Sequence, residues 1–151
     1  SRRAEVLIEP HIRAASTIRQ SGIETIPMGY ILVDGDRQSA VERVSGCTPI
    51  AHQAVADVVS HAVAGQLLGK QLIYIEAGSG AKTPVSIDTI RAVRQAIDLP
   101  LIVGGGITSE EQMLAAFSAG ANIVVIGNHF EQHPEDLPRF LQAKHSYVHN
   151  N

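Results

Sequence analysis

Hydrophobic positions along the chain alternate between helical and strand spacing. Apolar residues three or four apart predict helices, and short apolar runs predict strands. The first segment is a predicted helix at residues 8–21 that stops at Gly22, and a predicted strand follows at residues 24–34. Residues 34–49 have no clear period, which predicts a long connection.

From Pro49 onward the alternation becomes regular. Residues 49–70 carry the strongest helical pattern of the chain. Strands are then predicted at residues 71–77, 99–104 and 122–127, and helices at residues 86–97, at residues 109–120 and from residue 135. Ser86 and Ser109 are predicted caps of two of these helices, and Gln112 completes a capping-box pattern with Ser109.

This order of elements predicts an α/β fold. The strands after residue 70 are apolar on both faces, which favours a parallel sheet covered by helices. Four strand and helix units fit either an open, doubly wound sheet or half of a (β/α)8 barrel, because a whole barrel typically needs about 250 residues. The chain has 151 residues and begins without methionine, so we expect one domain, or part of one, from a longer protein.

Composition and charge narrow the class of partner. The formal net charge is −3 and the basic residues are scattered, which argues against nucleic acid binding. No apolar stretch approaches the roughly 20 residues that cross a bilayer, and no leader is evident, so we expect a cytoplasmic protein without a transmembrane segment. Cys47 is the single cysteine, which excludes an internal disulfide and fits a reducing compartment.

Glycines follow three of the predicted strands, in the sequences GSG, GGGIT and GNHFE. The carboxyl ends of parallel strands meet at one edge of the sheet, where ligands bind in this architecture. Glycine lets a ligand approach the backbone, and the first amides of a helix are unpaired. We therefore expect Gly105, Gly106, Gly127 and Asn128 to form a phosphate cradle, although tight turns alone would also explain these glycines.

A glutamate stands near the end of an otherwise apolar strand. Tyr74 and Glu76 lie two residues apart and are predicted to point to the same side. Burial of an ionised carboxylate without a partner is costly, so Glu76 needs either a ligand hydroxyl or a basic side chain from elsewhere in the chain.

Other polar side chains give weaker signals. His129 and His133 have a metal-like spacing but no matching carboxylate cluster, so solvated histidines are expected. Arg37, Arg43 and Lys82 lie among predicted connections, where they either bind a second anion or are simply solvated.

At these residues the chain resembles the geranylgeranylglyceryl phosphate synthase family. The motifs IPMGYILVD, YIEAGSGA, PLIVGGGI and VVIGN carry the resemblance, which runs from about residue 5 to about residue 142. It implies a phosphate-binding TIM-barrel prenyltransferase of phospholipid biosynthesis. Such an enzyme joins sn-glycerol 1-phosphate to geranylgeranyl diphosphate and releases diphosphate and geranylgeranylglyceryl phosphate, an ether lipid precursor.

The resemblance also assigns roles to residues. Glu76 would orient the glycerol and accept its proton as the catalytic group. The implied glycerol phosphate site consists of Tyr74, Ile75, Glu76, Ala77, Gly78, Ser79, Gly80, Gly105, Gly106, Gly127 and Asn128. Thr108 stands where relatives often carry arginine, which bears on the strength of phosphate binding.

Residues 1–151 would then form a single partial barrel domain, covering the last four βα units without strands one to four. The family uses Mg²⁺, whose ligands would lie in the absent half, and a homo-oligomer is expected because two open sheet edges promote association. Two alternatives stay open: another phosphate-binding (β/α)8 enzyme, such as an isomerase or a relative of thiamin phosphate synthase, or a non-catalytic half-barrel fragment.

Overall fold

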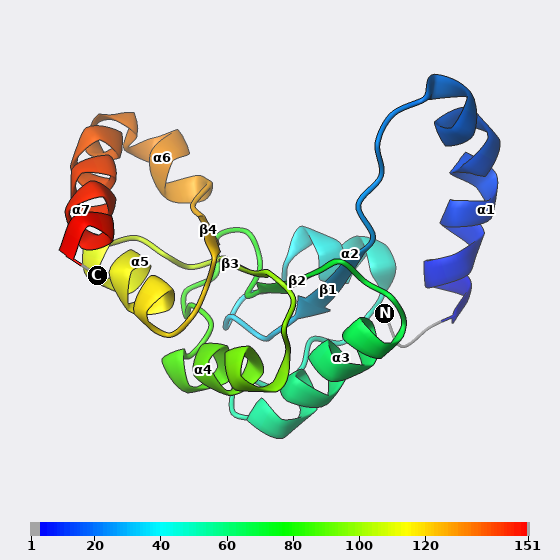
Figure 1. Cartoon of the computed structure of the whole chain (residues 1–151), viewed down its shortest axis with the longest axis horizontal. Helices are drawn as coiled ribbons and strands as arrows, with labels where there is room; N and C mark the ends of the chain where they lie inside the picture. Colours follow the sequence, from blue (N-terminus) through cyan, green and yellow to red (C-terminus); the bar gives the residue numbers. More distant parts are fainter. Residues whose placement is uncertain (1–3, 151) are drawn as a thin grey trace.

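The structure is a computed structural model in which residues 4–150 are described. Strands and helices alternate through most of the chain (Figure 1). In order, the elements are α1 (Ala4–Ser21), β1 (Met28–Leu32), α2 (Ala40–Ser45), α3 (Val55–Leu67), β2 (Leu72–Glu76), α4 (Ile87–Ala96), β3 (Leu101–Gly104), α5 (Glu110–Ser118), β4 (Ile123–Val125), α6 (Asn128–Gln132), η1 (Pro134–Asp136) and α7 (Leu137–Asn150).

The strands form one parallel sheet in the order β1-β2-β3-β4. Tyr30 is paired with Tyr74, and Glu76 is paired with Gly104. Strand neighbours in sequence are neighbours in space, whereas a doubly wound sheet reverses its strand order at a switch point. The predicted α/β fold is confirmed, and the consecutive order is that of a (β/α) barrel.

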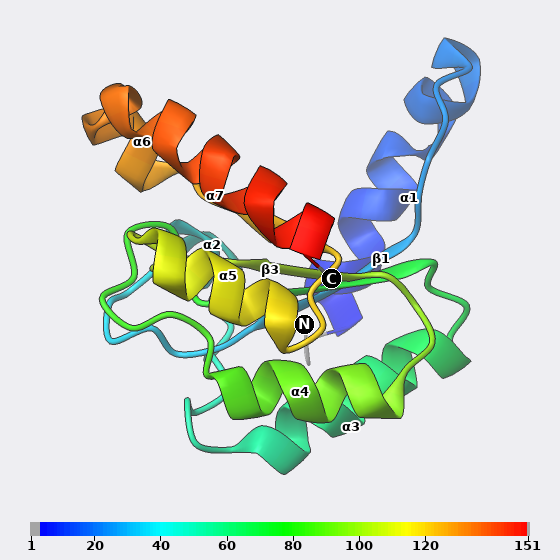
Figure 2. The same ribbon diagram turned by 60° about the vertical axis from the view of Figure 1, so that its left-hand side comes forward.

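The hydrophobic core lies between the sheet and the helices below it (Figures 1 and 2). Ile73 and Ile75 of β2 and Val103 of β3 are fully buried against a helix layer that includes Val58 of α3 and Val93 of α4. The pleat alternates side chains between the faces, so these residues leave Tyr74 and Glu76 to the other face.

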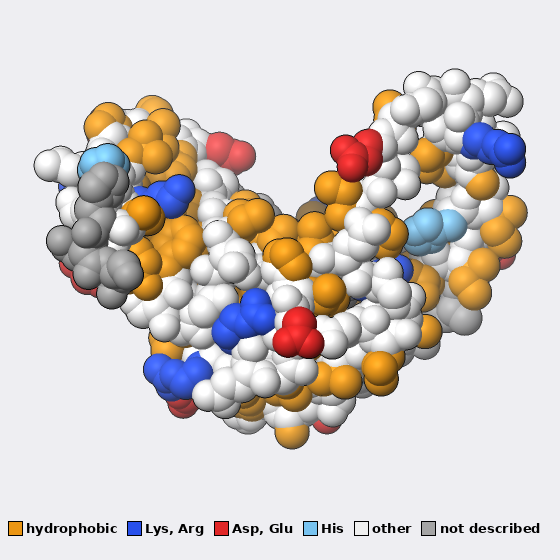
Figure 3. Space-filling model, in the orientation of Figure 1, with side chains coloured by type: hydrophobic (Ala, Val, Ile, Leu, Met, Phe, Trp, Pro, Cys, Tyr) orange, Lys and Arg blue, Asp and Glu red, His pale blue; other side chains and the backbone are white. Residues whose placement is uncertain are grey.

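The opposite face of the sheet is hollowed. Figure 3 shows apolar side chains gathered between two raised arms, which Figure 1 identifies as α1 and the α6–α7 region. This face carries the side chains that alternate with the core residues along each strand. It includes three exposed apolar residues: Met28, Ile123 and Val125. The sheet was expected to be covered by helices; within residues 4–150 they pack closely on only one side, because the other face is the one that lines the interior of a barrel.

Two helix starts follow the sequence prediction. The Ser86 hydroxyl accepts a hydrogen bond from the Thr89 amide at 3.2 Å, and the Ser109 hydroxyl accepts one from the Gln112 amide at 3.3 Å. The second half of the capping box is shifted by one residue, because the Gln112 side chain accepts from the amide of Thr108 instead of Ser109. Both predicted caps are therefore confirmed.

Other boundaries differ from the prediction. The connection at residues 34–49 contains α2, whose start is capped by Ser39. The long helix begins at Val55 because Ile50 is held beside β1: its amide donates to Leu32, and its carbonyl accepts from Asp34. Helix α6, directly after β4, was not predicted.

Ser86 offers a direct test of helix capping. A Ser86→Ala variant is expected to lose about 1 kcal/mol of unfolding free energy, because the Thr89 amide loses its acceptor. Urea unfolding followed by circular dichroism measures the change. Ser60→Ala is the control, since the Ser60 hydroxyl contacts a carbonyl within α3 and caps no helix. Equal stabilities for the two variants would contradict the role of Ser86.

Within residues 4–150, no helix combines the length and the apolar content needed to cross a membrane.

Candidate functional site

A pocket of about 260 Å³ lies at the carboxyl ends of the strands. The turns after all four strands contribute to it, as the predicted architecture requires. Its lining consists of Tyr30, Ser39, Ala40, Val41, Tyr74, Glu76, Ser79, Gly80, Ala81, Gly105, Gly106, Ile107, Thr108, Val125, Ile126, Gly127, Asn128 and His129. The strand-end loops that the sequence singled out therefore share one cavity.

Glu76 is the acidic group of this pocket. Its side chain comes from the last residue of β2 and is only 8% exposed. Carboxylate oxygen Oε1 accepts a hydrogen bond of 3.0 Å from the Gly78 amide, which fixes the orientation of the group. No Lys, Arg or His pairs with Glu76 among the described residues, so the alternative of a basic partner within this part of the chain finds no support.

Two tyrosines stand beside Glu76. The rings of Tyr30 and Tyr74 meet edge to face, with centroids 5.3 Å apart. Burial, followed by the negative charge of Glu76, raises the pKa of Tyr30 to about 12. The pKa of Tyr74 is raised further by burial, by a hydrogen bond to Glu76 and by the charge of that carboxylate. Both phenols are therefore neutral donors at physiological pH.

These raised pKa values predict a loss of stability in alkali. The folded chain retains phenolic protons that the unfolded chain releases, so the unfolding free energy should fall as the pH rises from about 10 towards 12. Urea unfolding at several pH values measures the slope, which should be shallower in a Tyr30→Phe variant. Absorbance titration at 295 nm is the companion measurement; ionisation of all tyrosines together near pH 10 in the folded chain would contradict the shifts.

Three consecutive glycines, at the last residue of β3 and the two residues after it, each make room for a neighbouring group. A Cβ on Gly104 would lie 2.5 Å from the Tyr74 hydroxyl, and one on Gly105 would lie 2.8 Å from the Gly78 amide nitrogen. A Cβ on Gly106 would lie 2.9 Å from the Pro84 nitrogen. Gly105 and Gly106 also have positive φ angles of 85° and 74°. Loop packing therefore already requires glycine here, before any ligand is considered.

The turns after β3 and β4 leave backbone donors free. None of the described residues accepts a hydrogen bond from the amides of Gly106, Gly127 or Asn128. Unpaired amides in a pocket favour an anion or a polar ligand. Close packing explains why residues 104–106 are glycine, since a side chain would collide with a neighbouring group. The unpaired amides remain available to a ligand.

Some predicted site residues lie away from the cavity. The side chains of Ile75 and Ala77 are buried in the core on the helix side, because they alternate with Tyr74 and Glu76 along the strand. Gly78 is also outside the lining, and its amide is already bonded to Glu76. The predicted stretch from Tyr74 to Gly80 is therefore broader than the set of residues that lines the pocket.

Several lining residues were not in the predicted site. Tyr30 could have been found from the sequence, since the strand containing it precedes the one containing Tyr74 in a parallel sheet. Ser39 enters through α2, which the sequence did not reveal. His129 was expected to be solvated, and this is wrong: its side chain is only 12% exposed and packs against Phe130 and Phe140.

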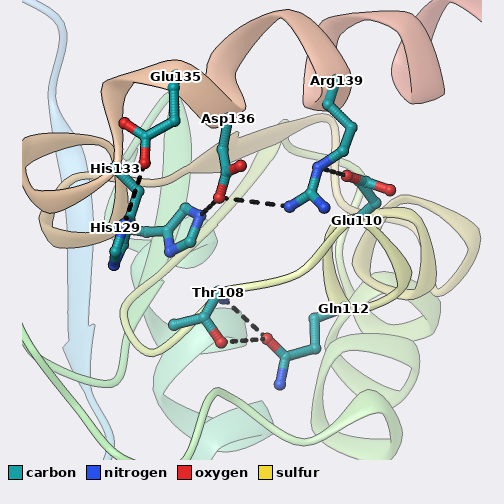
Figure 4. A network of polar contacts seen from close by, with 8 residues as sticks. All are labelled: Thr108, Glu110, Gln112, His129, His133, Glu135, Asp136 and Arg139. Carbon is teal, nitrogen blue, oxygen red and sulfur yellow. Dashed lines mark hydrogen bonds and ion pairs between the residues drawn. The ribbon is translucent and has the colours of Figure 1, made fainter.

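A chain of polar contacts holds His129 in the pocket wall (Figure 4). Its Nε2 lies 2.9 Å from an Asp136 carboxylate oxygen, which also lies 3.3 Å from Nη2 of Arg139. The Arg139 guanidinium in turn pairs with Glu110 at the start of α5. Individual exposed ion pairs stabilise by only about 0–1 kcal/mol, but together these contacts connect α6, η1, α7 and α5 around the pocket.

Metal binding has no candidate centre in the described part of the chain. Within residues 4–150, no three His, Cys, Asp or Glu side chains lie close enough together to hold an ion. His129 and His133 face separate carboxylates, Asp136 and Glu135. The described residues therefore contain no protein-only metal centre of three such ligands.

Comparison with known proteins gives a consistent result. Residues 1–144 match the PcrB family. The geranylgeranylglyceryl phosphate synthase of Spirosoma linguale is 46% identical over 138 residues. Wild-type GGGPS from Thermoplasma volcanium superposes with a TM-score of 0.79 at 38% identity. The (S)-3-O-geranylgeranylglyceryl phosphate synthase of Thermoplasma acidophilum, solved in complex with its substrate sn-glycerol-1-phosphate, gives a TM-score of 0.74 at 37% identity.

The matches cover most of this chain but only part of each relative. The alignment with the Spirosoma linguale protein includes 91% of this chain and 55% of that protein. The two Thermoplasma structures are covered to 51% and 47%, by 85% and 78% of this chain. The chain therefore spans about half the length of the relatives that it matches.

Proposed function

The chain belongs to the PcrB family, and from this premise we propose that the protein joins sn-glycerol 1-phosphate to geranylgeranyl diphosphate. The observation that carries the proposal is the pocket itself, in which a buried carboxylate, Glu76, lies beside unpaired backbone amides. A carboxylate suits alcohol groups, and the amides suit a phosphate. Glycerol phosphate carries both chemistries in one small molecule.

The proposed reaction assigns a separate task to each side of the pocket. The amides of Gly105, Gly106, Gly127 and Asn128 hold the phosphate, and Glu76 accepts a hydrogen bond from a glycerol hydroxyl. The hydroxyl oxygen forms a bond to the prenyl carbon while the bond from that carbon to diphosphate breaks. The hydroxyl proton passes to Glu76, and diphosphate leaves.

Tyr74 and Gly78 prepare Glu76 for this task. Both donate hydrogen bonds to the carboxylate, so the group is oriented before a ligand enters. Preorganisation of this kind lowers the cost of aligning the reacting groups.

Other features of the proposal concern the whole protein. Mg²⁺ would assist the departure of diphosphate, but the described residues include no group of three metal ligands, and we assign it no step. A homo-oligomer and a cytoplasmic location also stay predictions. Size-exclusion chromatography tests the oligomer.

Calorimetry tests the proposed function on this chain. We expect binding of sn-glycerol 1-phosphate that is at least about tenfold tighter than binding of its 3-phosphate enantiomer. The amides would hold the phosphate and Glu76 both hydroxyl groups, and with its two ends held in the same places the enantiomer directs its central hydroxyl away from Glu76. Release of diphosphate from geranylgeranyl diphosphate then measures turnover. Equal binding of the enantiomers would favour a different phosphate-binding barrel enzyme, and selective binding without turnover would favour a non-catalytic barrel fragment.

A further inference from the structure

A tight turn after β1 presents Arg37 to the pocket rim. The Asp34 carboxylate accepts a hydrogen bond of 2.9 Å from the Asp36 amide, and Asp36 adopts a positive φ of 59°. The Asp36 carboxylate in turn accepts a hydrogen bond from the Thr83 hydroxyl. The carboxylates of Asp34 and Asp36 are thus engaged by other groups, and no ion pair of Arg37 occurs within the part of the chain that the structure describes.

The Arg37 guanidinium lies beside Gly80, a lining residue of the pocket. Its Nη1 donates to the Gly80 carbonyl over 3.3 Å. A Cβ built on Gly80 would lie 2.9 Å from Arg37 Nη1 and 3.7 Å from Asn128 Nδ2. The guanidinium and the carboxamide therefore flank Gly80 at the rim, and a side chain on Gly80 would collide with the guanidinium.

The Asn128 side chain is oriented by Ser79. The Ser79 hydroxyl donates a hydrogen bond of 2.7 Å to Asn128 Oδ1. Since the oxygen is occupied, the Nδ2 donors are directed to Gly80, and none of residues 4–150 accepts a hydrogen bond from them. Two sets of donors, one of them positively charged, thus meet on this side of the pocket.

The pocket has no permanently charged cation in its lining. The described lining contains Glu76 and His129 but neither lysine nor arginine, and Thr108 occupies a position next to the glycine turn. A phosphate ester is doubly charged near neutral pH. Without a cation from outside the lining, neutral amides alone would have to hold this charge next to the Glu76 carboxylate. A guanidinium is well suited to such an anion because its planar fork donates two parallel hydrogen bonds.

We propose that Arg37, together with the carboxamide of Asn128, binds a phosphate-type anion of the substrates at the Gly80 rim. This inference rests on the proposed function, which supplies two such anions: the phosphate of glycerol phosphate and the diphosphate of the prenyl donor. Arg37 is a binding residue that supplies a guanidinium where the pocket lining has neither lysine nor arginine, and the absence of a side chain on Gly80 lets the guanidinium approach the rim.

The test is a calorimetric titration of the 151-residue chain with sn-glycerol 1-phosphate and, separately, with inorganic diphosphate. Arg37→Ala should weaken binding of at least one anion by about tenfold or more, the usual effect of losing a charged hydrogen bond. Arg37→Lys should lose less affinity, because lysine keeps the positive charge but lacks the two parallel donors of the guanidinium. Arg43→Ala is the matched control: it removes the same charge from exposed α2 and should change affinity by less than about twofold.

The outcomes separate the sources of the anion. A loss for glycerol phosphate alone places Arg37 on the phosphate ester, and a loss for diphosphate alone places it on the leaving group. If the wild-type chain binds glycerol phosphate and Arg37→Ala binds both anions like Arg43→Ala, the role of Arg37 is overturned and the proposed function stands. If the wild-type chain binds neither anion, both proposals fail.

Discussion

A Glu76→Gln variant is expected to bind sn-glycerol 1-phosphate about ten to a hundred times more weakly than the wild-type chain, with a larger loss in turnover. The amide keeps the size of the side chain but removes its charge, and one of its two ends becomes a donor. It would then face the Gly78 amide and the Tyr74 hydroxyl, which both donate to the carboxylate. Calorimetry measures the affinity, and diphosphate release measures turnover.

A second carboxylate provides the control for this variant. Glu131 is exposed on α6 and does not line the pocket, so Glu131→Gln removes the same charge without touching the ligand. Thermal unfolding of both variants shows whether the fold is kept. If Glu76→Gln retains wild-type affinity and turnover in a folded chain, Glu76 has no part in the reaction.

A Gly105→Ala variant is expected to lose measurable binding of glycerol phosphate and about 3 kcal/mol of unfolding free energy. The new Cβ would lie 2.7 Å from a Glu76 carboxylate oxygen and 2.8 Å from both the amide nitrogen and the carbonyl oxygen of Gly78. Backbone on both sides gives little room for relaxation. The loop must shift, and Glu76 shifts with it.

Gly69→Ala separates the two parts of this effect. Gly69 has a similar φ of 77°, but a Cβ there meets no atom within 4 Å. This variant should therefore lose only about 1 kcal/mol of unfolding free energy and bind glycerol phosphate with the affinity of the wild-type chain. Urea unfolding and calorimetry on both variants make the comparison. Equal losses in stability would mean that backbone conformation, and not the contact with Gly78, sets the cost at Gly105.

The order of elements could be predicted because local signals agreed with the tertiary structure. Ser86 and Ser109 cap helices as expected, and the apolar runs before Glu76 and Gly104 are strands. The family resemblance, drawn from four short motifs, is confirmed by the match over residues 1–144.

Boundaries that depend on distant partners could not be predicted in the same way. Ile50 continues the helical pattern of the residues that follow it, yet it pairs with Val33 beside the sheet. His129 has no local signal for burial, because its partners Phe140 and Asp136 belong to later elements. Helix α2 is the exception: Ser39, Glu42 and Gly46 carry cap signals that the sequence interpretation passed over.

The site was predicted well where the alternation of side chains along a strand alone determines which residues face the pocket. Tyr74 and Glu76 share the pocket side, as their spacing required, and the same alternation could have excluded Ile75 and Ala77. The reason for the glycines was only half predicted. Contact between Gly105 and the Gly78 backbone is a tertiary feature, and the sequence pattern of three glycines does not reveal it.

A crystal structure of this chain with sn-glycerol 1-phosphate would show where the ligand binds. We expect density for the phosphate within hydrogen-bond distance of amides from Gly105, Gly106, Gly127 or Asn128, and a glycerol hydroxyl on the Glu76 carboxylate. Density for the ligand at any other surface, with Glu76 bonded only to Tyr74 and Gly78, would contradict this expectation.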